Sequence, residues 1–210
     1  MNFFAIKYYN AGLMPIPVNP ETKLRHFKDD LGNYIQVGFY KNDRIEKWER
    51  ERIEKVFQNA KGIAIACGKP SGGLEALDME GKFDVTGMLF ENFKHKLITR
   101  LGKDFFKSLV IQKTQHQGWH IYYKCPEIVN QPQKTKLGFW GSKVLALNRN
   151  GKCLIETRSN PNYSMVYPTK GYYLIQGNYE NIPAISPQEY FTIHSICKEI
   201  HEGEQKMRKS

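Results

Sequence analysis

The sequence has few cysteines, and their spacing does not suggest a metal site or a disulfide framework. Its four cysteines, Cys67, Cys125, Cys153 and Cys197, are scattered and form no C-x-x-C pair. A zinc ribbon needs closely spaced cysteine pairs, and disulfide frameworks occur in short, cysteine-rich secreted chains. We therefore expect reduced cysteines, no zinc and a cytoplasmic location.

Long apolar segments and several common catalytic motifs are also missing. No apolar run reaches the length of about 18 residues that suggests a membrane span, and residues 1–7 do not resemble a signal peptide. The chain has no internal repeat, no Walker A motif, no G-x-G-x-x-G after a strand and no G-x-S-x-G. These absences argue against P-loop NTPases, dinucleotide-binding enzymes and serine hydrolases of the nucleophile-elbow type.

Positive charge is what the chain has in excess. Its 210 residues include 31 Lys and Arg against 21 Asp and Glu, which leaves a net charge of +10. Hydrophobic residues make up 40% and aromatic residues 13%, which is enough apolar material for a folded core. Because Lys and Arg neutralise phosphates and release counterions, the charge suggests a polyanionic partner without identifying it.

The apolar pattern predicts helices and hairpins. The length suggests one domain of two intimate subdomains over residues 1–205, followed by a charged tail at 206–210. Helices are expected at 2–10, 43–59, 85–101 and, after the capping box of Ser186 and Glu189, to about 202. Strands are expected at 14–18, 62–67, 74–78, 109–114, 119–124, 144–147 and 153–158. We expect 62–67 and 74–78 to form a hairpin across their glycine-rich turn and 126–142 to be a loop. The mixture indicates an α+β fold.

Two acids end the second strand of that expected hairpin. Asp78 and Glu80 are two residues apart, and side chains at this spacing in a strand share a face. Oxygen ligands placed in this way suit Mg²⁺ or Mn²⁺, which take one or two carboxylates together with substrate phosphates. An ordinary acidic turn is the alternative.

Two further positions could join these acids. His120 lies in an aromatic strand after a tight turn. It is either a core histidine or a hydrogen-bond donor to a phosphate group. Glu156 lies in an expected strand, and an unpaired buried carboxylate is costly. It therefore faces solvent, pairs with Arg158 or binds metal. Three carboxylates and a basic residue would make a two-metal phosphoryl-transfer site.

Three segments, in this order, resemble the motifs of the bifunctional primase–polymerase domain of the archaeo-eukaryotic primase superfamily, which occurs in plasmids, phages and other mobile elements. They are residues 62–81, residues 114–123, and residues 154–158 with 167–172. The similarity runs from about residue 14 to residue 192. The resemblance implies that Asp78, Glu80 and Glu156 bind two Mg²⁺ or Mn²⁺ ions, and that His120 and Arg158 lie beside the incoming nucleotide.

The sequence departs from the family's usual pattern at a few positions. Glu80 stands where Asp is usual, which keeps the charge on a side chain one methylene longer. Gln117 replaces a common Gly, and Gly118 stands where some relatives carry Ser, so a phosphate contact could differ. Residues 159–163 replace a glycine-rich segment, which affects the shape of that loop rather than the metal site.

The resemblance also implies a fold, a function and partners. The fold would be an N-terminal α/β unit packed on an RRM-like antiparallel sheet with flanking helices, with the active cleft between them. The function would be primase or DNA polymerase activity in the replication of a mobile element, with single-stranded template, primer and NTP or dNTP as partners. Many relatives are fused to a replicative helicase, so residues 206–210 either begin a linker or end a stand-alone form. A catalytically silent single-stranded nucleic-acid-binding module and a metal-dependent nuclease are the alternatives.

Basic residues in and after the 126–142 loop are candidates for nucleic-acid contacts. They are Lys134, Lys136, Lys143 and Arg149. Phe139 and Trp140 are candidates for stacking on bases. The alternative is a solvated linker that holds two ordinary aromatic anchors.

Overall fold

The fold is built around two antiparallel sheets. The computed structural model describes residues 1–24, 27–28, 34–35, 48–131, 143–159 and 162–206. One sheet has three strands in the order β1-β4-β10, and the other has six in the order β11-β6-β7-β5-β9-β8. A separate two-stranded ribbon pairs β2 with β3. The expected α+β class is confirmed.

The element bounds follow the chain order. The helices are α1 (Asn2–Asn10), α2 (Arg50–Val56), α3 (Leu89–Leu101), α4 (Lys103–Ser108), α5 (Pro126–Val129) and α6 (Pro187–Lys206). The strands are β1 (Pro15–Val18), β2 (Phe27–Lys28), β3 (Tyr34–Ile35), β4 (Gly62–Ala66), β5 (Leu74–Met79), β6 (Val110–Lys113), β7 (Trp119–Lys124), β8 (Val144–Leu147), β9 (Cys153–Arg158), β10 (Tyr163–Val166) and β11 (Tyr173–Gln176). Short 3₁₀ turns are η1 (Lys69–Ser71), η2 (Gly81–Phe83) and η3 (Tyr179–Asn181). No helix in the described part of the chain has the length and apolar character of a bilayer span.

The expected hairpin between residues 62–67 and 74–78 is wrong, because these strands lie in different sheets. β4 pairs with β1 and β10, whereas β5 pairs with β7 and β9. Between them the chain passes through η1, and Gly68, Gly72 and Gly73 all have positive φ. These residues turn the chain from one sheet to the other. The described pairing between the two segments is one isolated antiparallel β-bridge, between Gly68 and Leu74.

Helix boundaries agree with the sequence where local capping decides them. The Ser186 backbone N–H donates to Glu189 Oε2 (2.7 Å), so the predicted capping box does begin α6. The expected start of α3 at residue 85 is wrong. Asp84 Oδ2 accepts from the Leu89 backbone N–H (2.9 Å), so the helix begins at Leu89 and Val85 is 91% exposed.

Two segments are described only in part. In the segment expected to be a helix at 43–59, the described part contains the shorter α2, and residues 43–47 lie outside the described residues. The loop expected at 126–142 begins with the short helix α5, and residues 132–142 lie outside the described residues.

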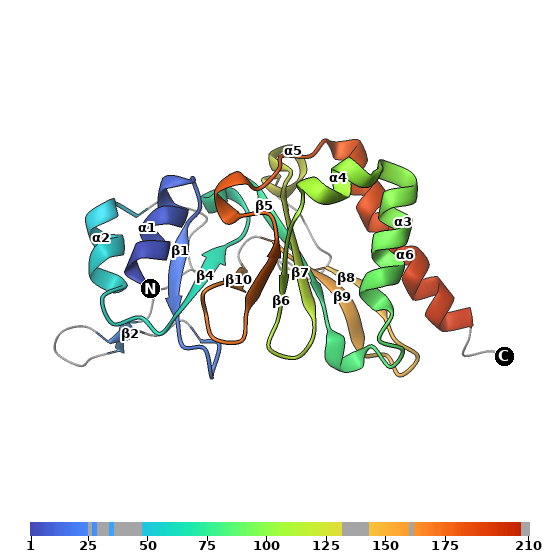
Figure 1. Ribbon diagram of the computed structural model, residues 1–210, viewed down its shortest axis with the longest axis horizontal. Helices are drawn as coiled ribbons and strands as arrows, with labels where there is room; N and C mark the ends of the chain where they lie inside the picture. The colour runs from blue at the N-terminus through green and yellow to red at the C-terminus, as the bar shows by residue number, and fades with distance from the viewer. Residues whose placement is uncertain (25–26, 29–33, 36–47, 132–142, 160–161, 207–210) are drawn as a thin grey trace.

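The six-stranded sheet separates two hydrophobic cores. Leu74 and Ala76 face the core that β1, β4, α1 and α2 also build. Leu77 and Met79 face the core beneath α3, α4 and α6. Because side chains alternate along a strand, β5 contributes to both cores and carries Asp78 on the side of the three-stranded sheet. Figure 1 shows α1, α2, β1 and β4 at one end of the molecule and α3 and α6 at the other.

A fully buried carboxylate fastens β5 to α6. Glu75 accepts hydrogen bonds from Tyr123 Oη (2.7 Å) on β7 and from Ser159 Oγ, and His194 Nε2 on α6 lies 3.1 Å from its Oε1. Buried charges need such partners because desolvation is costly. This network lies on the opposite face of β5 from Asp78 and holds the strand against its helical layer.

Candidate active site

Three polar side chains form a row across adjacent strands of the six-stranded sheet. Asp78 on β5 is directly opposite His120 on β7 and directly opposite Glu156 on β9. Opposed residues in antiparallel strands have Cβ atoms about 4.5–5.5 Å apart. Sheet register therefore brings together residues that are far apart in the sequence.

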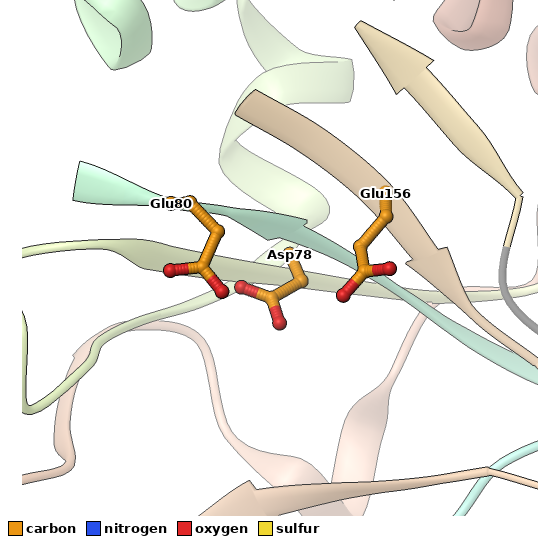
Figure 2. A group of neighbouring side chains, drawn as sticks. All are labelled: Asp78, Glu80 and Glu156. Atoms are coloured by element: carbon orange, nitrogen blue, oxygen red, sulfur yellow. The ribbon is translucent and has the colours of Figure 1, made fainter. Parts of the chain in front are cut away.

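Glu80 completes a group of three acids. It lies just beyond the end of β5, before η2. Asp78, Glu80 and Glu156 each offer a carboxylate oxygen within 4.8 Å of the others, as a metal site requires. Figure 2 shows Asp78 between the other two, with the three carboxylate groups turned toward the same space. The three acids singled out in the sequence thus form one cluster.

A guanidinium group lies between two of these acids. Arg158 donates from Nε (3.1 Å) and Nη2 (2.9 Å) to Asp78 Oδ2. The same Nη2 lies 2.5 Å from Glu156 Oε1. The salt bridge between Glu156 and Arg158 considered in the sequence is therefore present, and Asp78 belongs to it as well.

These neighbours move the pKa values of the acids in opposite directions. Burial raises the pKa of Asp78, but His120 and Arg158 lower it by more, so it lies well below its usual range. For Glu156, burial and the negative charges of Asp78 and Glu80 outweigh the effect of Arg158, and its pKa is raised. Asp78 is thus held ionised, whereas repulsion from the neighbouring acids helps to raise the pKa of Glu156.

A buried polar network fixes the ring of His120. Its Nδ1 lies 2.9 Å from Gln112 Nε2 and 3.0 Å from both Tyr122 Oη and Ser164 Oγ. Gln112 Oε1 accepts from the Tyr167 backbone N–H (3.1 Å), so the amide nitrogen faces the ring. Gln112 Nε2 also lies 2.6 Å from the Met165 carbonyl oxygen. Nδ1 is thus held inside this network, and Nε2 faces the acids, 3.4 Å from Asp78 Oδ1.

Two glycines allow the strand carrying the acids to approach the turn before His120. A Cβ at Gly118 would overlap the carbonyl oxygen of Met79, and a Cβ at Gly81 would overlap the Gln117 carbonyl group. The backbone at the end of β5 therefore touches the β6–β7 turn. At Gly118, where some similar domains carry Ser, this chain has no room for a side chain.

Two of the acids, Asp78 and Glu80, line a cleft of about 240 Å³, and Glu156 lies beside them. Its lining comes from both sheets and from the loop after β1: Lys23, Asp78, Glu80, Thr114, His116, His120, Arg158, Asn162, Tyr163, Ser164, Met165 and Tyr172. Tyr172 is buried, and burial together with the charge of Asp78 raises its pKa to about 12. The cleft is therefore polar, and Tyr172 keeps its phenolic proton near neutral pH.

The candidate nucleic-acid residues lie outside this cleft lining where the structure describes them. Lys134, Lys136, Phe139 and Trp140 fall outside the described residues. Arg149 lines a different cavity of about 440 Å³, between η2, α3 and the β8–β9 turn. Lys143 is half-buried just before β8, where its backbone N–H donates to Thr157 Oγ1 (3.0 Å).

Several cleft residues were missed by sequence reasoning. Gln112 and Ser164 hold His120, and Lys23 and Tyr172 line the cleft. Ser164 lies 44 positions from His120 in the chain. Only the pairing of β10 with β4 brings such residues together, so no local sequence signal marks them.

The donor set of the cluster suits a hard divalent cation. It consists of carboxylate oxygens only, which Mg²⁺ and Mn²⁺ prefer, and no cysteine belongs to it. The Arg158 guanidinium already occupies a cation position between Asp78 and Glu156. The three acids could therefore hold a metal ion.

Comparison with known proteins identifies the family. No curated protein sequence matches the chain. The family model described as "Bifunctional DNA primase/polymerase, N-terminal" matches residues 5–189, most of the chain, and this span includes all three acids, His120 and Arg158. The family's activity is of the DNA primase/polymerase type, and its substrates are DNA and nucleotides. The chain belongs to the bifunctional DNA primase/polymerase (Prim-Pol) family.

Proposed function

We propose that this chain is a template-dependent nucleotidyltransferase that joins NTP or dNTP to a 3′-hydroxyl by a two-metal mechanism. The observation that carries the proposal is the row of His120, Asp78 and Glu156 on three adjacent strands, with Glu80 beside it. Asp78, Glu80 and Glu156 would hold two Mg²⁺ or Mn²⁺ ions. Such ions lower the pKa of the attacking hydroxyl and neutralise charge on the leaving pyrophosphate.

The chain's own groups then bind and orient the triphosphate. His120 presents Nε2 to the cleft, because Nδ1 is occupied by the network of Gln112 and Ser164. An N–H at Nε2 would donate a hydrogen bond to a phosphate oxygen. Arg158, which now pairs with Asp78 and Glu156, would pair with the nucleotide when these acids hold metal ions.

A role in the replication of a mobile element rests on the family resemblance alone and stays a prediction.

The first test is synthesis on a defined template. A single-stranded oligonucleotide with a labelled primer is incubated with Mg²⁺ or Mn²⁺ and dNTPs or NTPs, and product lengths are read on a denaturing gel. We expect primer extension. Asp78→Asn should reduce its rate by about 10³-fold, because loss of a metal ligand removes several kcal/mol of charge stabilisation.

A matched control and the other outcomes decide between the alternatives. Asp104→Asn removes a fully exposed carboxylate on α4, far from the cluster, and should leave the rate unchanged. Template shortening would instead support a nuclease, and binding without synthesis a catalytically silent module. Full synthesis by Asp78→Asn would remove Asp78 from the metal site.

A further inference from the structure

Two cations in or beside the described cleft already form ion pairs with carboxylates. Arg158 binds Asp78 and Glu156, and Lys82, which lies beside the cleft, reaches Glu80 (3.2 Å). A triphosphate that enters must compete with these carboxylates for Arg158. A cation without an acidic partner would bind phosphate without that competition.

Lys23 is such a cation. It lines the same cleft as Asp78 and His120, and among the described residues no carboxylate forms an ion pair with its ammonium group. It comes from the loop after β1, a strand of the three-stranded sheet. An exposed lysine is ordinarily a solvated charge, so its placement needs a structural cause.

The loop that carries Lys23 is closed on itself. The Lys23 backbone N–H donates to the Asn19 carbonyl (2.8 Å), and the Asn19 N–H donates to the Leu24 carbonyl (3.0 Å). Asn19 Oδ1 also accepts from the Glu21 N–H (2.8 Å). Lys23 has a φ of 58°, a conformation uncommon for a residue with a Cβ. These hydrogen bonds hold the turn in one shape.

The loop is also tied to both sides of the cleft. Tyr163 on β10 donates from its hydroxyl to the Lys23 carbonyl (2.8 Å). Gln115, in the turn before His120, donates from Nε2 to the Pro20 carbonyl (3.3 Å) and to the Lys170 carbonyl (2.9 Å). The backbone of Lys23 is therefore positioned against the same turn that leads to His120.

We propose that Lys23 is a triphosphate-binding residue, supplied by the loop after β1 to the cleft that His120 also lines. This inference rests on the proposed function, because it assumes that the cleft takes a nucleoside triphosphate. Nucleotide binding then joins the loop after β1 to the six-stranded sheet. Tyr163 is a positioning residue, since it acts through the carbonyl of Lys23.

The test compares ligands that differ only in their phosphates. Dissociation constants of ATP and AMP are measured by calorimetry with Mg²⁺ and without template. Lys23→Gln should weaken ATP binding by about fivefold to tenfold, the effect of losing a charged hydrogen bond. AMP binding should not change. Lys23→Arg should retain most of the ATP affinity, and Tyr163→Phe should weaken ATP binding by a smaller factor.

A control variant and a kinetic measurement separate binding from folding. Lys61→Gln removes an exposed lysine just before β4, outside the cleft, and should leave ATP affinity unchanged. In primer extension, Lys23→Gln should raise the KM for nucleotide with little change in kcat. Its ATP affinity should also fall less steeply with salt than that of the original protein.

The outcomes distinguish the two proposals. Unchanged ATP affinity in Lys23→Gln would overturn the role of Lys23 and leave the proposed function standing. Equal weakening of ATP and AMP would also overturn it, since it would show a structural effect on the loop. Failure of the original protein to bind either ATP or dATP, measured in the same way, would overturn both proposals.

Discussion

Arg158 fits two interpretations of the sequence, as a salt-bridge partner and as a nucleotide contact. Its sequence position, two residues after Glu156, suggests either a salt bridge or a nucleotide contact. The structure shows the guanidinium bound to both Asp78 and Glu156. Because three carboxylates lie within 4.8 Å of one another, the guanidinium offsets repulsion that a metal ion would otherwise offset.

This arrangement predicts an altered response of Arg158→Gln to metal. Without metal, the variant should melt about 2–8 °C lower than the original protein, which corresponds to a loss of about 1–2 kcal/mol. Mn²⁺ should then raise its Tm by more than it raises that of the original protein, since no guanidinium competes for the acids. Thermal melts in chelator and in Mn²⁺ measure both effects.

Arg100 provides the control for this prediction. Its guanidinium pairs with Glu199 (2.6 Å), away from the cluster. Arg100→Gln should therefore show the same metal-induced shift as the original protein. Equal shifts in Arg158→Gln and the original protein would mean that Arg158 does not compete with the ion.

At the scale of elements, the contact between the end of β5 and the β6–β7 turn sets the distance between the acids and His120. Gly81 and Gly118 lie on the two sides of this contact, and neither has room for a Cβ. A methyl group here would have to separate the two backbones, since the obstacles are backbone atoms rather than mobile side chains.

Gly118→Ala should therefore lower both stability and function. We expect a loss of about 1–3 kcal/mol in the free energy of unfolding, the usual effect of overpacking, together with weaker ATP binding as His120 shifts. Gly87→Ala tests backbone strain alone, because Gly87 has a φ of +69° and open space around its Cβ position. It should lose stability by a similar or smaller amount without losing ATP affinity. Normal ATP binding by Gly118→Ala would contradict this account.

On the scale of the whole molecule, β5 couples the two hydrophobic cores. Its residues alternate between them, and Glu75 and Asp78 place buried charges on opposite faces. Neither core can open without exposing one face of this central strand. We therefore expect the two parts of the chain to unfold as one cooperative unit.

Calorimetry of a pair of core variants tests this expectation. Ile65 on β4 and Ile193 on α6 are both fully buried, one in each core. Ile65→Ala and Ile193→Ala should each remove about 2–5 kcal/mol and should shift the same single transition, with equal calorimetric and van't Hoff enthalpies. Two transitions, each moved by only one variant, would show that the two parts unfold separately.

The local distribution of charge at the cleft says more about function than the net charge of +10 does. The excess suits a polyanionic partner, but Asp78 and Glu80 line the cleft with Glu156 clustered beside them, and these carboxylates oppose a nucleic acid. Cations bound at these acids would remove that opposition. The three acids, whose charge is opposite to the net charge, thus identify where chemistry on the partner would take place.

The sequence by itself determined the features that depend on neighbours along the chain. The alternation of β5 placed Asp78 and Glu80 at one strand end, the capping box began α6, and the order of the motifs indicated the family. Tertiary structure alone decided that β4 and β5 belong to different sheets, that Arg158 binds two acids, that Lys23 and Ser164 reach the cleft, and that Gln112 holds His120. The physical reason is the separation along the chain between the residues that determine each feature. Strand alternation and helix caps depend on residues a few positions apart, whereas sheet pairing and cleft lining arise from packing between segments that the sequence separates widely.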